Sequence, residues 1–242
     1  MSRSNPHENG AQNPATRWFE WNGENGTVRY YDKEAKQNIE VGSDFTFSLL
    51  DRLGTVGGWH DASQSGIYAN EVKDTRQDVL IVKAFKGGVL AEGLYKDIKD
   101  RVNNQGGQFV ANCYIAFKSA DGLAIGSIKF KGAALGAWME FEKAHRAELY
   151  SKAIRINGFT KGKKGRVVFR VPVLSVVPLA AETHLQAVAL DTQVQEFLKG
   201  YLSRTKRDQV EDAPAPHVSD EALGGGSFEE EPPPITDEDI PW

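Results

Sequence analysis

The chain has 242 residues, one cysteine and a hydrophobic content of 40%, and its formal net charge is −4. This length suits one large domain or two small ones, because a domain usually holds about 100–200 residues. A single cysteine excludes a disulfide framework. The polar N-terminus lacks the apolar stretch of a signal peptide, and no apolar run is long enough to span a membrane. The sequence therefore predicts a cytoplasmic protein that does not associate with membranes.

Charge is distributed unevenly along the chain. Residues 208–242 contain 11 acidic side chains and no lysine or arginine. Residues 1–207 therefore hold 29 basic and 22 acidic side chains and carry a net charge of +7. A basic body with an acidic tail is typical of a protein that binds a polyanion and uses the tail for interactions.

Composition divides the chain into three parts. Residues 1–16 are almost devoid of apolar side chains, and we expect a disordered arm. Residues 17–205 hold the aromatic and aliphatic side chains of a folded domain. Residues 206–242 are rich in proline, glycine and acidic residues, so they bury too little apolar surface to offset the entropy of ordering. We expect this last part to be a disordered acidic tail.

Within residues 17–205 the main pattern is the alternation of apolar and polar side chains that is typical of β-strands. In chain order, we expect strands at residues 45–49, 79–82, 109–117, 128–131, 154–157 and 166–177. The glycine-containing segments 22–26 and 161–165 predict hairpin loops, because glycine adopts the positive φ that such turns need.

Three apolar stripes with helical spacing predict helices near residues 94–102, 135–139 and 191–202, the last with Asp191 as its N-cap. At least seven strands with about three helices favour a mainly β protein. The architecture that we expect is an antiparallel barrel similar to the oligonucleotide-binding (OB) fold, enlarged by these helices.

Motifs for enzymatic chemistry are weak. The chain has no phosphate-binding P-loop, its five histidines are scattered, and Cys113 lies on the apolar side of a predicted strand, so we expect no cofactor. One alternative stays open. Asp61 followed by Glu71 and Lys73 matches the D…E-x-K pattern of many metal-dependent nucleases, although a second E-x-K segment, at residues 34–36, shows how easily the pattern arises by chance.

Basic and aromatic side chains give a stronger signal. Five cations lie between residues 161 and 170, and aromatic residues are concentrated in the N-terminal third. Proteins that bind single strands without sequence preference use cations along the phosphates and flat rings that stack on bases. The residues expected to bind single-stranded DNA are Trp18, Trp21, Tyr30, Tyr31, Trp59, Lys129, Lys131, Arg155, Lys161, Lys163, Lys164, Arg166 and Arg170.

The most specific motif is the sequence of the last six residues, DEDIPW. Three carboxylates precede an apolar Ile-Pro-aromatic tip, which fits a partner pocket with an apolar floor and a basic rim. The residues expected to dock a partner protein are Asp237, Glu238, Asp239, Ile240, Pro241 and Trp242.

This tip resembles the D-D-D-I-P-F end of bacterial single-stranded DNA-binding proteins and the acidic, aromatic-ended tails of their phage counterparts. The resemblance implies a non-catalytic OB barrel that coats single-stranded DNA during replication, recombination or repair. It also implies that the tip recruits enzymes such as polymerase, helicase or primase.

Two departures favour a phage-type member acting in the host-cell cytoplasm. Trp242 replaces the final phenylalanine, and the body of about 190 residues is larger than a bacterial barrel. The resemblance leaves homo-oligomerisation open. A second alternative to DNA binding is an adaptor protein whose acidic tail only confers solubility.

Overall fold

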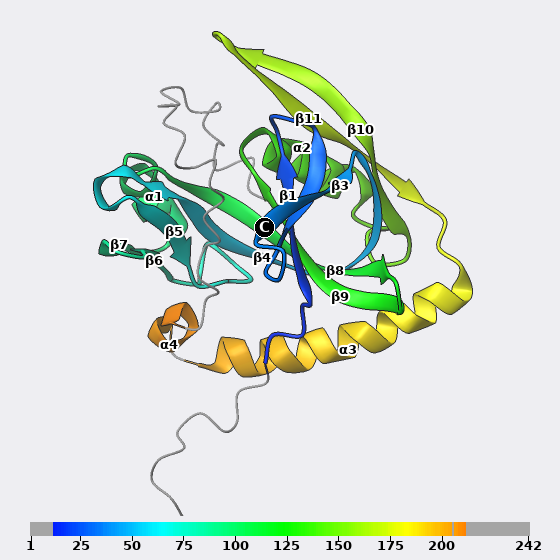
Figure 1. Ribbon diagram of the computed structural model, residues 1–242. Coiled ribbons are helices and arrows are strands. Elements are labelled where there is room, and N and C mark those ends of the chain that lie inside the picture. The colour runs from blue at the N-terminus through cyan, green and yellow to red at the C-terminus, as the bar shows by residue number, and fades with distance from the viewer. Residues whose placement is uncertain (1–11, 205, 212–242) are drawn as a thin grey trace, which may run out of the picture.

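The computed structural model describes residues 12–204 and 206–211 (Figure 1). Within them, eleven strands form one mixed sheet, accompanied by four α-helices and a short 3-10 helix. In chain order the elements are β1 (Arg17–Asn22), β2 (Thr27–Asp32), β3 (Gln37–Gly42), β4 (Asp44–His60), η1 (Asp61–Ser63), β5 (Ser65–Ala69), β6 (Leu80–Ala84), β7 (Gly88–Gly93), α1 (Tyr95–Asn103), β8 (Gly107–Ser119), β9 (Gly122–Lys131), α2 (Gly132–His145), β10 (Ala153–Lys164), β11 (Val167–Val177), α3 (Ala181–Ser203) and α4 (Lys206–Glu211).

The prediction of a mainly β protein is confirmed, but the sheet is open rather than closed into a barrel. Its main path runs β3-β2-β1-β9-β8-β4-β5-β6-β7, and β10 joins β4 while β11 joins β10. All pairs are antiparallel except β1 with β9. The strands β10-β4-β8-β9 lie in the spatial order 4-1-2-3 of a Greek key.

Strand β4 is the longest element of the sheet, and three strands share its two edges. Strand β8 pairs with it from Phe47 to Gly58. On the opposite edge, β10 pairs with residues 44–47 and β5 pairs with residues 57–60. The sheet therefore splits into two arms beyond β4, one formed by β10 and β11 and the other by β5, β6 and β7 (Figure 1).

Two apolar cores hold the helices to the sheet. On the inner face, Trp138 of α2 is fully buried and stacks on Phe130 with ring centroids 4.9 Å apart. On the outer face, α3 packs Val194, Phe197 and Leu198 into the second core, which also contains Leu53 and Tyr114 of the sheet. α3 therefore covers part of the outer face of β4, β8 and β9.

The predicted helices near residues 94–102 and 135–139 are confirmed as α1 and α2, whereas the predicted start of the third helix is wrong. α3 begins at Ala181, ten residues before Asp191. In its first half, the large apolar side chains Leu185 and Val188 are 70% and 51% exposed, and the buried side chain is the small Ala187. The apolar spacing in the sequence therefore identifies only the second half of the helix.

The folded body also extends past both predicted boundaries. Ala15 is buried, and the Thr16 amide donates a hydrogen bond of 2.8 Å to the Ile125 carbonyl. At the other end, residues 206–211 form α4, whose Val210 is fully buried against the body. Each end carries one small buried apolar side chain, Ala15 or Val210. The average composition of a whole segment does not reveal a single such residue.

A polar network ties α3 to the outer face of the sheet. The Glu71 carboxylate accepts hydrogen bonds from Asn112 and from the Tyr114 hydroxyl (3.0 Å), and the Glu71 amide donates to the Tyr201 hydroxyl of α3 (2.8 Å). Burial raises the pKa of the Glu71 carboxyl, although Lys129 and the two hydrogen bonds act in the opposite direction. Burial also lowers the pKa of the nearby Lys129 ammonium.

The raised pKa predicts how stability depends on pH. Above the ordinary value of 4.5, the folded protein keeps the Glu71 proton longer than the unfolded chain does, so the stability that Glu71 contributes falls as pH rises towards its folded pKa. The difference in unfolding free energy between wild type and Glu71→Gln should therefore decrease with rising pH in urea titrations.

Glu148→Gln is the matched control. Hydrogen bonds from Lys152 and His145 lower the pKa of Glu148, so the corresponding difference should rise with pH up to 4.5. A wild-type advantage over Glu71→Gln that grows with pH would contradict this description of Glu71.

Candidate nucleic-acid interface

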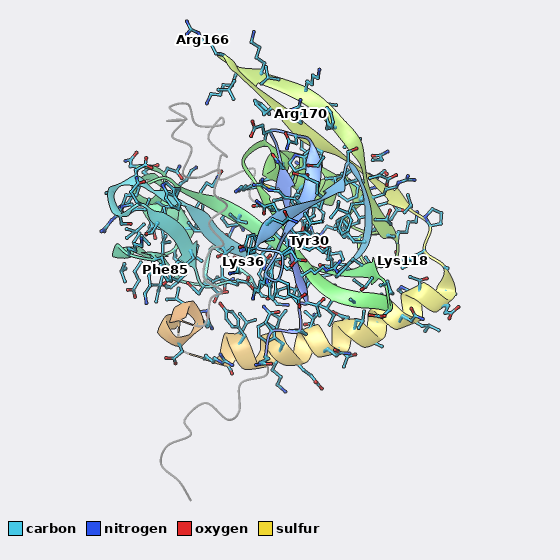
Figure 2. The ribbon with its side chains drawn as sticks, viewed as in Figure 1. Tyr30, Lys36, Phe85, Lys118, Arg166 and Arg170 are labelled. Carbon is cyan, nitrogen blue, oxygen red and sulfur yellow. The ribbon has the colours of Figure 1, made fainter. Side chains whose placement is uncertain are left out.

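The β10–β11 hairpin brings together the five cations that the sequence places between residues 161 and 170. It projects beyond the body of the protein, with Arg166 at its tip and Arg170 nearer its base (Figure 2). Strand pairing continues to Lys164 opposite Val167, so the turn is shorter than the predicted loop at 161–165. Within the described part of the chain, none of the five cations forms an ion pair with a carboxylate.

A β-bulge determines which side chains share the inner face of the hairpin. The register between β10 and β11 shifts after Ile156, where Gly158 has a φ of +106°. Before the shift, Ile154 and Ile156 are buried on the inner face. Beyond it, three residue pairs lie on the same face: Phe159 with Pro172, Lys161 with Arg170, and Lys163 with Val168. Phe159 is 37% exposed, and the Arg170 guanidinium lies 5.4 Å from its ring centroid. The inner face therefore carries cations beside an exposed aromatic ring.

The turn between β1 and β2 fixes the base of the hairpin. The Arg170 amide donates to the Gly23 carbonyl (2.7 Å), and the Trp21 indole N–H donates to the Arg170 carbonyl (2.9 Å). Gly26 has a φ of +73°, and a Cβ there would lie 2.5 Å from both Phe159 and Arg170. Only glycine lets the turn approach this closely. These contacts connect the β1–β2 turn to β11 without forming a strand ladder.

The structure places the N-terminal aromatic residues in different environments. Trp21 is 5% exposed and belongs to the core, so the expectation that it stacks on bases is wrong. Trp18 packs partly against the α3 core, with the Lys33 ammonium 5.3 Å from its ring centroid. Tyr30 contacts Phe19 and lies under the Arg17 guanidinium, while Tyr31 occupies the opposite face of β2.

Three predicted cations are engaged in contacts within the protein. Arg155 forms a bidentate ion pair with Asp44, on the face of β10 opposite Ile154 and Ile156. Lys131 lies 3.6 Å from Glu20, and Lys129 lies near the Glu71 network. Arg155 belongs to β10 but lies before the bulge, and Lys129 and Lys131 belong to β9, so none of the three lies in the cationic part of the hairpin between residues 161 and 170.

Trp59 lies on the second arm of the sheet, away from the hairpin. It pairs with Gly66 at the end of β4 and is half-buried. The docking residues 237–242 lie outside the described residues.

The residues of the nuclease alternative are separated by other contacts. Lys73 binds Asp51, with its ammonium 2.6 Å from the carboxylate, rather than Asp61 or Glu71. Both carboxylate oxygens of Glu71 accept hydrogen bonds from Asn112 and Tyr114. Within residues 12–204 and 206–211, no group of three or more histidine, cysteine or acidic side chains is arranged to hold a metal ion.

Sequence reasoning missed two exposed aromatic residues. Phe159 is 37% exposed on the inner face of the cationic hairpin, and Phe85, at 60% exposure, begins the turn after β6. An available signal was their position beside lysines and glycines, in Phe159-Thr-Lys and Phe85-Lys-Gly-Gly.

No protein-family model, curated protein or solved structure matches this chain. No helix in the described part of the chain is long and apolar enough to cross a membrane.

The hydrogen bond from Trp21 predicts that its indole N–H, and not only its ring, positions the hairpin. Trp21→Phe should leave the Arg170 carbonyl unpaired and reduce unfolding free energy by about 1–3 kcal/mol. Hydrogen exchange at backbone amides of residues 159–171 should become faster, because the hairpin base loses a restraint.

Trp138→Phe is the matched control, because the Trp138 indole N–H is buried without a partner in the described structure. This variant should leave exchange in the hairpin close to that of wild type. Equal exchange in the hairpin of Trp21→Phe and wild type would show that the indole N–H does not restrain it.

Proposed function

We propose that this protein binds single-stranded DNA without strong sequence preference, during replication, recombination or repair, and that the β10–β11 hairpin is its principal contact. The observation that carries the proposal is the cluster of five cations on one projecting hairpin, free of ion pairs within the described residues. Like charges held close together repel one another, so such a cluster is best explained by a polyanionic ligand that neutralises it.

Strand order supports an OB-type assignment for part of the sheet. We assign its five strands to β4, β8, β9, β10 and β11, and α2 lies between the third and the fourth of them. In OB folds, the loop between strands four and five contributes to oligonucleotide binding, and here that connection is the cationic hairpin. The face of strands two and three is used as well, but α3 covers much of the corresponding outer face in this protein.

The side chains beside the cations favour single strands over duplex DNA. Phe159 and Val168 lie on the same hairpin face as Lys161, Lys163 and Arg170, and Val168 is 52% exposed. Unpaired bases offer flat apolar surfaces to such side chains, whereas a duplex presents mainly its phosphates. Phosphate contacts and stacking carry little sequence information, which accounts for binding without strong preference.

Reversing charge on the hairpin tests the proposal. Replacing Lys161, Lys163 and Lys164 together by glutamate should weaken oligo(dT) binding and reduce its salt dependence. The slope of log K against log salt should fall by about 0.7 for each phosphate that the protein no longer neutralises. Fluorescence titrations over a range of salt concentrations give both quantities.

A control variant carries the same change in net charge elsewhere. Lys96, Lys118 and Lys199 are exposed on α1, β8 and α3, outside the hairpin. Replacing these three by glutamate should lower affinity less and leave the slope closer to that of wild type. If both triple variants gave the same slope of log K against log salt, the hairpin would not be part of the binding site.

We also propose that the acidic tip recruits other enzymes of DNA metabolism, because its motif resembles tips that do so. Deleting Trp242 should abolish capture of a polymerase, helicase or primase while oligo(dT) affinity is retained, since the terminal aromatic would be the anchor of the contact. Pull-downs with purified enzymes test this, and equal capture by the full-length and shortened chains would contradict it.

A further inference from the structure

In the second arm of the sheet, α1 covers the inner face, whereas α4 covers only part of the outer face. α1 buries Tyr95, Ile98 and Val102 on the inner side, where Tyr95 contacts Phe109 with ring centroids 5.0 Å apart. Ile67 and Ala84, which pair with each other, belong to the same core. Because side chains alternate between the faces of a strand, their neighbours on β5 and β6 lie on the opposite, outer face.

The strand register places three aromatic residues and a lysine on this outer face. Tyr68 pairs with Lys83, and Gly57, beside Tyr68, is two residues from Trp59 on β4. Phe85 begins the turn after β6, and its amide donates to the carbonyl of Gly66, which pairs with Trp59, so we place Phe85 at the edge of the same face. We call Trp59, Tyr68, Lys83 and Phe85 the aromatic face. These residues come from β4, β5, β6 and the turn after β6, and their chain positions span 27 residues.

Phe85 is the most accessible ring of the aromatic face, and the backbone around it is held in place. Its side chain is 60% exposed and lies on the second arm in Figure 2. The Phe85 amide donates to the Gly66 carbonyl (3.0 Å), and the Lys86 amide donates to the Ser65 hydroxyl (3.0 Å). Gly87 packs closely against His60 and Ser63. A ring on a fixed backbone loses little conformational freedom when a ligand stacks on it.

We propose that the aromatic face is a second contact for single-stranded DNA, in which unpaired bases stack on Phe85 and on the half-buried rings beside it. This inference rests on the proposed function and adds a site separate from the cationic hairpin. Figure 2 shows Phe85 and Arg166 on well-separated parts of the molecule, so one DNA strand would pass over the body between them.

The composition of the face argues for nucleobases rather than for a protein partner. The strongly exposed apolar side chains here are Phe85 and Val89, which is 53% exposed and pairs with Lys83, whereas Trp59 and Tyr68 are half-buried. A stable protein interface needs more than about 1,000 Å² of buried surface with an apolar centre. A single exposed ring beside the exposed Lys86 suits a base with its phosphate, and aromatic side chains on an open sheet face stack two or three bases in other nucleic-acid-binding proteins.

Buried side chains and α4 limit the aromatic face on the side of Ile81. One row further along the sheet, Ile81 is 3% exposed, and α4, with the buried Val210, packs on β6 there. Glu92 pairs with Ile81 and adds a negative charge at this boundary. This covered, acidic boundary would direct a bound strand across the opposite end of the face, which carries Phe85, Trp59 and the exposed Lys86.

The test compares full-length variants at Phe85 in binding oligo(dT) and an abasic deoxyribose-phosphate oligomer of the same length. Phe85→Ala should weaken oligo(dT) binding about five- to a hundredfold, the range expected when one base no longer stacks. Phe85→Leu should weaken it nearly as much, because leucine is apolar but has no ring, whereas Phe85→Trp should retain affinity. The abasic oligomer should bind all of these variants equally, and the salt slope should stay at its wild-type value.

Tyr150→Ala is the matched control, because Tyr150 is an exposed aromatic residue of similar accessibility, at 57%, outside the aromatic face. It should bind oligo(dT) like wild type. Wild-type affinity in Phe85→Ala, with weakened binding in the hairpin triple variant, would overturn the aromatic face and leave the proposed function standing. Retained affinity in Phe85→Leu would show an apolar contact without stacking and overturn the inference as well. A wild-type protein that does not bind oligo(dT) would overturn both proposals.

Discussion

The pairing of β4 with three different strands is the constraint on which both candidate binding surfaces depend. One edge of this 17-residue strand is occupied by β8, and the other is divided between β10 at its beginning and β5 at its end. A register shift between Leu49 and Asp51 lies between these two ends. Because β10 and β5 leave the same edge at different points, the cationic hairpin and the aromatic face belong to separate arms attached to one continuous strand.

The same residue types serve different purposes according to their partners. Lys73, Lys131 and Arg155 each have a carboxylate within ion-pair distance and stabilise the body of the protein. The five hairpin cations have no such partner within the described residues. Aromatic residues divide in the same way, since Trp21 and Trp138 are buried whereas Phe85 and Phe159 remain accessible. A ligand with phosphates and unpaired bases would use both of the accessible groups.

Local pattern in the sequence predicts much of the fold and one part of the site. Alternation identifies the strands around Phe109 and Val171, and the spacing of basic residues identifies the hairpin before its geometry is known. The burial of Trp21 could not be predicted from local sequence, because it depends on contact with the hairpin, which lies about 150 positions away in the chain. The aromatic face could not be predicted for a similar reason, because Trp59 and Phe85 are aligned only through Gly66 of β5, which pairs with Trp59 and accepts a hydrogen bond from the Phe85 amide.

Photocrosslinking to a halogenated oligo(dU), with the attachment sites mapped by mass spectrometry, tests most directly whether single-stranded DNA lies on both arms. We expect attachment to be concentrated on residues 159–170 of the hairpin and at Phe85 of the second arm, and to disappear when unlabelled oligo(dT) competes. Attachment that avoids the hairpin and gathers on the exposed surface of α3, or that duplex DNA displaces as well as single strands do, would contradict this assignment of the binding surfaces.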